Sequence, residues 1–259
     1  MTNEEAFLRI DFLSQELNKH NYQYYVLDQP SISDYDFDML MNELILLEKA
    51  YPQYCHSDSP SQRVGGEVIK KFEQVRHKYP MLSLGNTYSE SDIKDFYQRI
   101  MQSTIETENE IEYVCELKFD GAAISLWYEN GLLTRALTRG DGIQGDDVTH
   151  NIKTIPSVPL KLRGNYPKSF EIRGEVVMPH KSFEMLNAQK LEEGSTPFAN
   201  PRNAASGSLK LLDSKEVARR KLDCILYAFY SDDLPFNTHS EFLQDRKSTR
   251  LNSSHITIS

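Results

Sequence analysis

Apolar residues recur at helical spacing in two stretches near the N-terminus. Ile10, Leu13 and Leu17 lie three or four residues apart, and the same spacing is repeated by Phe37, Leu40, Leu44 and Leu47. Residues spaced in this way share one face of an α-helix. Between the two stretches, residues 26–33 contain turn-forming residues and should form a loop. The pattern predicts a helical hairpin over residues 2–50, with Ser33 as the cap of its second helix.

Further along the chain the apolar period changes to two. Residues 122–128 and 132–138 are β-prone runs joined by Asn130-Gly131, which is typical of a tight hairpin. Residues 170–178 alternate in the same way, and residues 222–230 predict a last strand. Helices are expected over residues 89–102 and 180–192. These elements predict an α+β protein with a small helical N-terminal domain, followed by a largely antiparallel sheet flanked by helices.

Composition limits what these domains can do. The 259 residues are 39% hydrophobic, which supports a real core, and the formal net charge is -9. That charge argues against a grip on a phosphate backbone through the overall field. The three cysteines are far apart and indicate neither a disulfide framework nor a zinc site. The acidic N-terminus has no apolar signal core and no run approaches a membrane span, so we expect a cytoplasmic protein without a membrane partner.

The stretch Cys115-Glu-Leu-Lys-Phe-Asp-Gly carries the first candidate for chemistry. On or next to a strand, Glu116, Lys118 and Asp120 share one face. A lysine with a pKa of ~10.4 is neutral in only about 1 molecule in 2,500 at pH 7, and neighbouring carboxylates favour the charged form further. A nucleophilic Lys118 therefore needs a divalent cation or a second basic group nearby. The alternative is a half-exposed strand whose lysine merely pairs with its acidic neighbours.

A second candidate is an aromatic and acidic cluster in the helical hairpin. Tyr24 and Tyr25 precede the loop, and the second helix begins with Asp34, Tyr35, Asp36, Phe37 and Asp38. Aromatic faces and carboxylates both attract cations, so the cluster suits a planar cationic ligand such as a nicotinamide ring. The acidic residues could equally complement the helix dipole.

Three further stretches are compatible with a ligand site or with an ordinary surface. Thr138-Arg139-Gly-Asp-Gly opens a run with three glycines that would let backbone approach a ligand closely. Glu171, Arg173 and Glu175 share one face of their predicted strand, which is either a partner of the lysine face or a solvated sheet face. Arg202 and Lys210 could hold a phosphate or balance local acids.

In their order along the chain, these stretches resemble the N-terminal part of bacterial NAD⁺-dependent DNA ligases. The resemblance rests on motifs that include Ser-Pro-Ser-Gln-Arg-Val-Gly, Pro-Met-Leu-Ser-Leu, Glu-Leu-Lys-Phe-Asp-Gly, Thr-Arg-Gly-Asp-Gly, Arg-Gly-Glu-Val and Phe-Ala-Asn-Pro-Arg-Asn-Ala-Ala-Ser-Gly-Ser-Leu. It implies a helical nicotinamide mononucleotide-binding domain at 1–70 and an ATP-grasp-like adenylation (nucleotidyltransferase) domain at 71–244. Residues 245–259 do not continue the family pattern, and we expect them to be disordered.

The resemblance also implies a reaction and a set of site residues. Lys118 would attack the α-phosphorus of NAD⁺, release nicotinamide mononucleotide and hold AMP, which then passes to a 5′-phosphate before the nick is sealed. Asp120 and Arg202 would support this step. The mononucleotide site would comprise Tyr24, Tyr25, Asp34, Tyr35, Asp36, Phe37 and Asp38. The rest of the NAD⁺ site would comprise Ser83, Leu84, Glu116, Arg139 and Glu175. Mg²⁺ is the implied metal, with zinc expected only in C-terminal parts that this chain lacks.

Departures from the family pattern shape what we expect of this chain. Some relatives have histidine at position 25 and many have tyrosine at position 37, where this chain has Tyr25 and Phe37. Because the later domains are missing, we expect the chain to self-adenylate at most, to bind DNA weakly or not at all, and to be monomeric, whereas the full-length protein would act on nicked duplex DNA. The alternatives are a catalytically dead NAD⁺-binding fragment and an ATP-using covalent nucleotidyltransferase.

Overall fold

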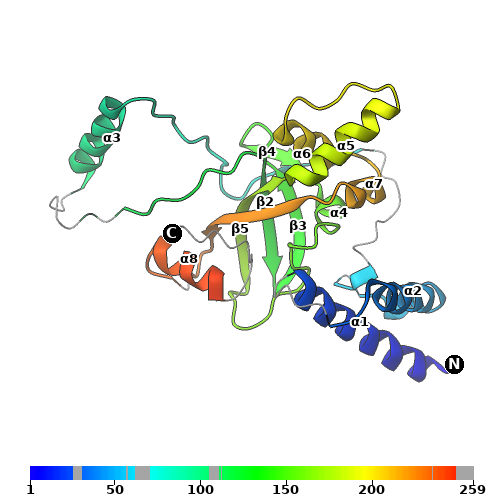
Figure 1. The fold of residues 1–259 in the computed structure, drawn as a ribbon. Helices are drawn as coiled ribbons and strands as arrows, with labels where there is room; N and C mark the ends of the chain where they lie inside the picture. Colours follow the sequence, from blue (N-terminus) through cyan, green and yellow to red (C-terminus); the bar gives the residue numbers. More distant parts are fainter. Residues whose placement is uncertain are drawn as a thin grey trace.

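The structure is a computed structural model, shown in Figure 1, that describes residues 1–25, 31–56, 58–61, 71–104, 111, 113–234 and 236–248. A helical pair comes first, and a sheet domain with flanking helices follows. The α+β fold predicted from the sequence is confirmed. No helix in the described ranges is long and apolar enough to cross a membrane.

The helical hairpin forms as its apolar spacing predicts. Helix α1 (Asn3–Tyr25) packs against α2 (Asp34–Ala50), and a short 3₁₀ turn, η1 (Pro52–Tyr54), follows. The residues completely buried between the helices are Ile10, Leu13, Leu17 and Leu44. Ser33 caps α2 by accepting a hydrogen bond from the backbone N–H of Asp36 at 3.1 Å. The pair therefore has a small core of its own.

Four antiparallel strands form the main sheet in the order β3-β2-β5-β6. Their bounds are Ala122–Glu129 for β2, Leu132–Thr138 for β3, Ser169–Val177 for β5 and Asp223–Tyr230 for β6. Asn130 and Gly131 take positive φ values of 49° and 78°, as the predicted hairpin turn between β2 and β3 requires. A second sheet pairs β1 (Gln74–Arg76) with β4 (Gln144–Asp146).

Alternation along β2 and β5 gives the main sheet two different faces. Ile124, Leu126 and Ile172 point to the hydrophobic core and are fully buried. The intervening residues of β5 carry charge, and two of them, Glu171 and Arg173, are buried although they lie on the other face. The solvated face that we weighed as an alternative is therefore wrong for these two residues. One face of the sheet is apolar core, and the opposite face is polar.

Helices cover the apolar face of the sheet. Their bounds are Thr149–Ile152 for α4, His180–Glu192 for α5, Pro201–Leu209 for α6, Ser214–Arg219 for α7 and His239–Ser248 for α8. Figure 1 shows α4 to α7 gathered on one side of the sheet, with α8 apart from them. Helix α8 continues past position 244, which differs from the disorder that we expected from residue 245 onward. Residues 249–259 lie outside the described part of the chain.

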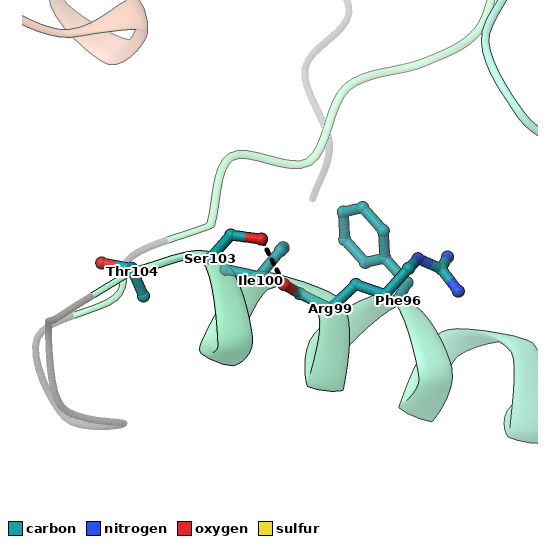
Figure 2. A pocket seen from close by; sticks show the side chains of 5 residues that line it. All are labelled: Phe96, Arg99, Ile100, Ser103 and Thr104. Carbon is teal, nitrogen blue, oxygen red and sulfur yellow. Dashed lines mark hydrogen bonds between the residues drawn. The ribbon is translucent and has the colours of Figure 1, made fainter.

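Helix α3 (Glu90–Ser103) stands away from the rest of the fold. Ser89 and Asp92 form a capping box at its start, as the predicted helix boundary suggests. None of its residues is buried, and Figure 1 shows it joined to the sheet domain by two long extended connections. A shallow hollow on the helix is lined by Phe96, Arg99, Ile100, Ser103 and Thr104 (Figure 2). The hollow is lined only by residues of α3 and its C-terminal cap, with none of the predicted site residues among them.

Candidate functional site

Lys118 lies in an extended segment, residues 113–120, that leads directly into β2. The sequence predicted Lys118 on or next to a strand. Because β2 begins at Ala122, the lysine lies next to the strand and is not part of it. Lys118 is exposed and forms no ion pair with any other described residue. The lysine therefore does not pair with its acidic neighbours, as the alternative interpretation required.

Gly121 fixes where this segment meets the sheet. A Cβ atom placed on Gly121 would lie 2.2 Å from the backbone oxygen of Val176, which is far inside contact distance. Only glycine lets the chain pass so close to β5. The backbone N–H of Gly121 also donates a hydrogen bond to the Glu175 carboxylate. The residue after Asp120 is thereby held against the end of β5, three positions from Lys118.

Each carboxylate that flanks Lys118 has a basic partner. The Asp120 carboxylate accepts a hydrogen bond from Arg202 Nη1 at 2.9 Å, and both side chains are largely exposed. The Glu116 carboxylate accepts one from His239 Nε2 at 2.6 Å. The sequence argument required a cation or second basic group beside the lysine face, and the structure places Arg202 and His239 there.

Glu175 is the partly buried acid of the site. Burial raises the pKa of this carboxyl above its ordinary value, while the Gly121 N–H and the positive charges of Arg202 and Lys118 act in the opposite direction. A Cβ atom placed on Gly121 would lie 3.0 Å from Glu175 Cγ, so Glu175 lies beside the segment that carries Lys118 and Asp120. Glu175 thus joins Lys118, Asp120 and Arg202 in one cluster at the end of β5.

A buried ion pair lies beside this cluster on the polar face of the sheet. Arg173 donates to Glu171 Oε1 at 2.6 Å, and also to the backbone oxygens of Tyr79 at 2.5 Å and Pro80 at 3.0 Å. Its guanidinium group lies 4.3 Å from the centre of the Tyr230 ring, against which Tyr79 also stacks. Arg173 therefore fastens residues 79–80 across the polar face.

The segment that Arg173 fastens, residues 79–80, leads to two further predicted site residues. Ser83 Oγ lies 3.5 Å from Arg139 Nη1, a long hydrogen bond between two exposed residues, and Leu84 is exposed beside it. The loop after Arg139 is held by the buried His77, whose Nε2 lies 3.1 Å from the Arg139 backbone oxygen. The structure thus brings Ser83 and Arg139 together.

The residues predicted in the helical pair lie elsewhere. Asp36 accepts a hydrogen bond from the Ser33 hydroxyl at 2.6 Å, and Phe37 packs against the core of the hairpin. Tyr35 and Asp38 are exposed. The side chains of Tyr24, Tyr25 and Asp34 lie outside the described part. Asp36, which is also exposed, therefore fits the alternative of a helix-terminus residue.

The helical pair and Lys118 lie at opposite ends of β2. Leu162 donates its backbone N–H to the oxygen of Gly131, in the turn at the far end of β2. The next residue, Arg163, donates from Nη2 to the backbone oxygen of Asn18 in α1 at 3.5 Å. Lys118 comes just before the start of β2, at the opposite end from this contact. An eight-residue strand is about 25 Å long, so roughly this distance separates the two ends. No hydrogen bond or ion pair between described residues joins Asp36 or Asp38 to the Lys118 cluster.

The described residues do not form a metal cage. No group of three or more histidine, cysteine or acidic side chains among them could hold a metal ion. Asp120 and Glu116 are each engaged by a basic residue, which lowers their value as ligands. A Mg²⁺ ion at this site would have to be held mainly by phosphate oxygens of the substrate, as is usual for this metal.

Several features of the site escaped the sequence interpretation. His239 and His77 lie in no motif that marks them, because the histidines are scattered along the sequence. The tight approach of Gly121 to Val176 depends on strand pairing that the sequence does not show. Arg202 is a candidate phosphate ligand from its own stretch, but its partner Asp120 lies 82 positions away.

Comparison with known proteins identifies both parts of the chain. Residues 3–65 match the family model described as DNA ligase-like, N-terminal NAD⁺-binding domain, and residues 69–258 match the NAD-dependent DNA ligase adenylation domain. The DNA ligase of Flavobacterium psychrophilum is 55% identical over 236 residues, which are 91% of this chain and 35% of the relative. The DNA ligase of Parabacteroides distasonis is 56% identical over 237 residues, again 91% and 35%. The chain spans about 35% of the length of these relatives.

Proposed function

Because this chain belongs to the NAD-dependent DNA ligase family, we propose that it carries the first step of ligation, the transfer of AMP from NAD⁺ to Lys118. The complete reaction, in which the AMP activates a 5′-phosphate and a nick in duplex DNA is closed, is proposed for the whole protein. The chain spans only about a third of its relatives, and nicked DNA is therefore the proposed partner of that longer protein.

In this step the neutral Lys118 amine attacks the α-phosphorus of NAD⁺. A nitrogen–phosphorus bond forms to AMP, and the pyrophosphate P–O bond to nicotinamide mononucleotide breaks. The mononucleotide leaves with the bridging oxygen and the electron pair, while the lysine loses its proton to solvent. The attack requires a neutral amine and a phosphate whose negative charge is balanced.

The observation that carries the proposal is the state of the two flanking carboxylates. Arg202 and His239 engage Asp120 and Glu116, and neither carboxylate pairs with Lys118. Neither sequence neighbour therefore holds the Lys118 amine in an ion pair, and the amine is available to a bound nucleotide. Glu175, Arg139 and Ser83 supply additional polar groups around the same end of the sheet.

NAD⁺ has two ends, and the chain offers a binding region for each. We assign the AMP half to the Lys118 cluster and the nicotinamide half to the exposed Tyr35 and Asp38 of α2. Since the two regions lie at opposite ends of β2, the helical pair must approach the lysine for one NAD⁺ to contact both. Mg²⁺ remains a proposed cofactor that would supply positive charge at the phosphates, and no protein residue here is assigned to it.

The experiment that tests the proposal is label transfer. The purified chain is incubated with Mg²⁺ and either NAD⁺ labelled in its AMP half or ATP labelled in the α-phosphate. We expect label on the parent chain from NAD⁺ alone, and none on Lys118→Arg. Label from ATP would favour an ATP-using transferase instead.

The remaining alternative, a dead NAD⁺-binding fragment, gives a different result in the same samples. It predicts that NAD⁺ raises the melting temperature of the parent chain although no label is transferred. That result would refute self-adenylation by this chain while leaving its family membership intact.

A further inference from the structure

The extended segment that carries Lys118 has little backbone support. Within the described part of the chain, no backbone–backbone hydrogen bond fastens residues 113–120 to another segment. Its position therefore depends on side chains on either side of the lysine. Asp120 is tied to Arg202, and Glu116 is tied to His239 at 2.6 Å, although Glu116 and His239 are 123 positions apart.

His239 stands at the start of α8, where the backbone is fixed by a reciprocal cap. The backbone N–H of Glu241 donates to Thr238 Oγ1 at 3.1 Å, and the Glu241 carboxylate accepts from the N–H groups of Asn237 at 2.8 Å and Thr238 at 3.3 Å. This arrangement satisfies amide groups at the helix start and defines the direction of its first residue.

Aromatic packing holds the same helix end against the sheet domain. Phe242 is buried, with its ring 5.8 Å from that of Phe229 in β6 and 5.7 Å from that of Phe236. The His239 ring lies 5.7 Å from the Phe242 ring. The imidazole thus has a packed face and a defined orientation, and its Nε2–H is directed at the Glu116 carboxylate.

We infer that His239 is a positioning residue for the NAD⁺ site, which rests on the function proposed above. By donating to Glu116 Oε1, it holds this carboxylate in place and leaves Oε2 to accept a hydrogen bond from the nucleotide. It also anchors the Lys118 segment to α8 on the N-terminal side of the lysine, while the Asp120–Arg202 pair anchors the segment on the C-terminal side. Helix α8 is therefore part of the support of the nucleotide site.

The test compares three variants of the whole chain. His239→Leu removes the donor, His239→Gln keeps an amide N–H that can reach Glu116, and His180→Leu changes an exposed histidine at the start of α5 as the matched control. Formation of the lysine adduct is followed at a series of NAD⁺ concentrations, and melting temperatures are recorded for each variant.

We expect the half-saturating NAD⁺ concentration to rise about tenfold in His239→Leu, the value of one hydrogen bond to a charged group. The rate at saturation should change little, His239→Gln should restore most of the affinity, and His180→Leu should match the parent. Unchanged NAD⁺ dependence in a folded His239→Leu would overturn the inference. An equal loss in His239→Gln and His239→Leu would also overturn it, since it would indicate a general effect on α8.

Failure of the proposed function can be told apart from failure of this inference. If the parent forms no adduct, the proposed function is refuted, and NAD⁺ affinity measured by calorimetry then decides on His239. Affinity about tenfold weaker in His239→Leu supports its role, and equal affinity contradicts it. A parent that neither forms the adduct nor binds NAD⁺ overturns both. If His239→Leu does not fold, His239→Asn replaces it, because the shorter amide cannot reach Glu116.

Discussion

Replacing Arg173 by methionine should destabilise the sheet domain strongly. The Arg173 and Glu171 side chains are 7% and 3% exposed, and their bond is 2.6 Å long. Without Arg173, the Glu171 carboxylate stays buried without its cation, and Glu171 Oε2 already has no partner among the described residues. Breaking a buried pair on one side costs about 3–5 kcal/mol. Losing the bonds to the Tyr79 and Pro80 backbone oxygens adds to this cost.

The double variant Glu171→Met with Arg173→Met separates the charge from the packing. With no unpaired charge left in the interior, we expect its free energy of unfolding to fall by only about 1–2 kcal/mol relative to the parent, mostly for the two freed backbone oxygens. The double variant should therefore be more stable than Arg173→Met alone. Such non-additivity is the signature of direct coupling between the two residues.

Urea unfolding followed by circular dichroism measures these differences. Arg219→Met serves as the matched control, because Arg219 pairs with Glu216 on the surface and should cost less than about 1 kcal/mol. If Arg173→Met cost no more than Arg219→Met, or if the double variant were no more stable than Arg173→Met alone, the buried pair would not organise this face.

Three further predictions concern the lysine cluster. Gly121→Ala should destabilise the chain by about 1–3 kcal/mol and abolish adduct formation, because its Cβ meets the Val176 oxygen, whereas Gly85→Ala, with nothing within 4 Å, should be neutral in urea unfolding and adduct assays. Because burial raises the pKa of Glu175 above its ordinary 4.5, folding favours its protonated form, so stability is lost as pH rises from that value. Glu175→Gln should accordingly raise the melting temperature at pH 8 and not at pH 4, and equal gains at both would contradict the assigned cause. Arg202→Ala should slow adduct formation at least about tenfold while changing stability by less than about 1 kcal/mol, as befits an exposed pair.

Local signals in the sequence predicted the elements of the fold well. The Asn130-Gly131 turn, the helical spacing from Ile10 to Leu17 and the cap at Ser33 each depend on residues close together in the chain. Their outcomes follow from backbone sterics and from burial of one helix face. The same signals could not show that Glu171 and Arg173 are buried, because the segment that covers them, residues 79–80, lies more than 90 positions away.

The candidate site shows the same division between local and distant information. Lys118, Asp120 and Arg202 are candidates from their own stretches of sequence, but the pairing of Asp120 with Arg202 arises only when α6 packs beside the sheet. His239 could not be found at all from the sequence, since its contact with Glu116 depends on how α8 is capped and packed. The sequence predicts that a divalent cation or a second basic group must offset the carboxylates, and the fold determines that Arg202 and His239 lie beside them.

The measurement that most directly tests the central claim is intact-mass spectrometry of the chain after incubation with NAD⁺ and Mg²⁺, followed by peptide mapping of any adduct. We predict one AMP per chain, located on Lys118 and absent from Lys118→Ala and from samples given ATP. A folded parent chain that gains no AMP, or gains it on another residue, would contradict the assignment of Lys118 as the nucleophile in this chain.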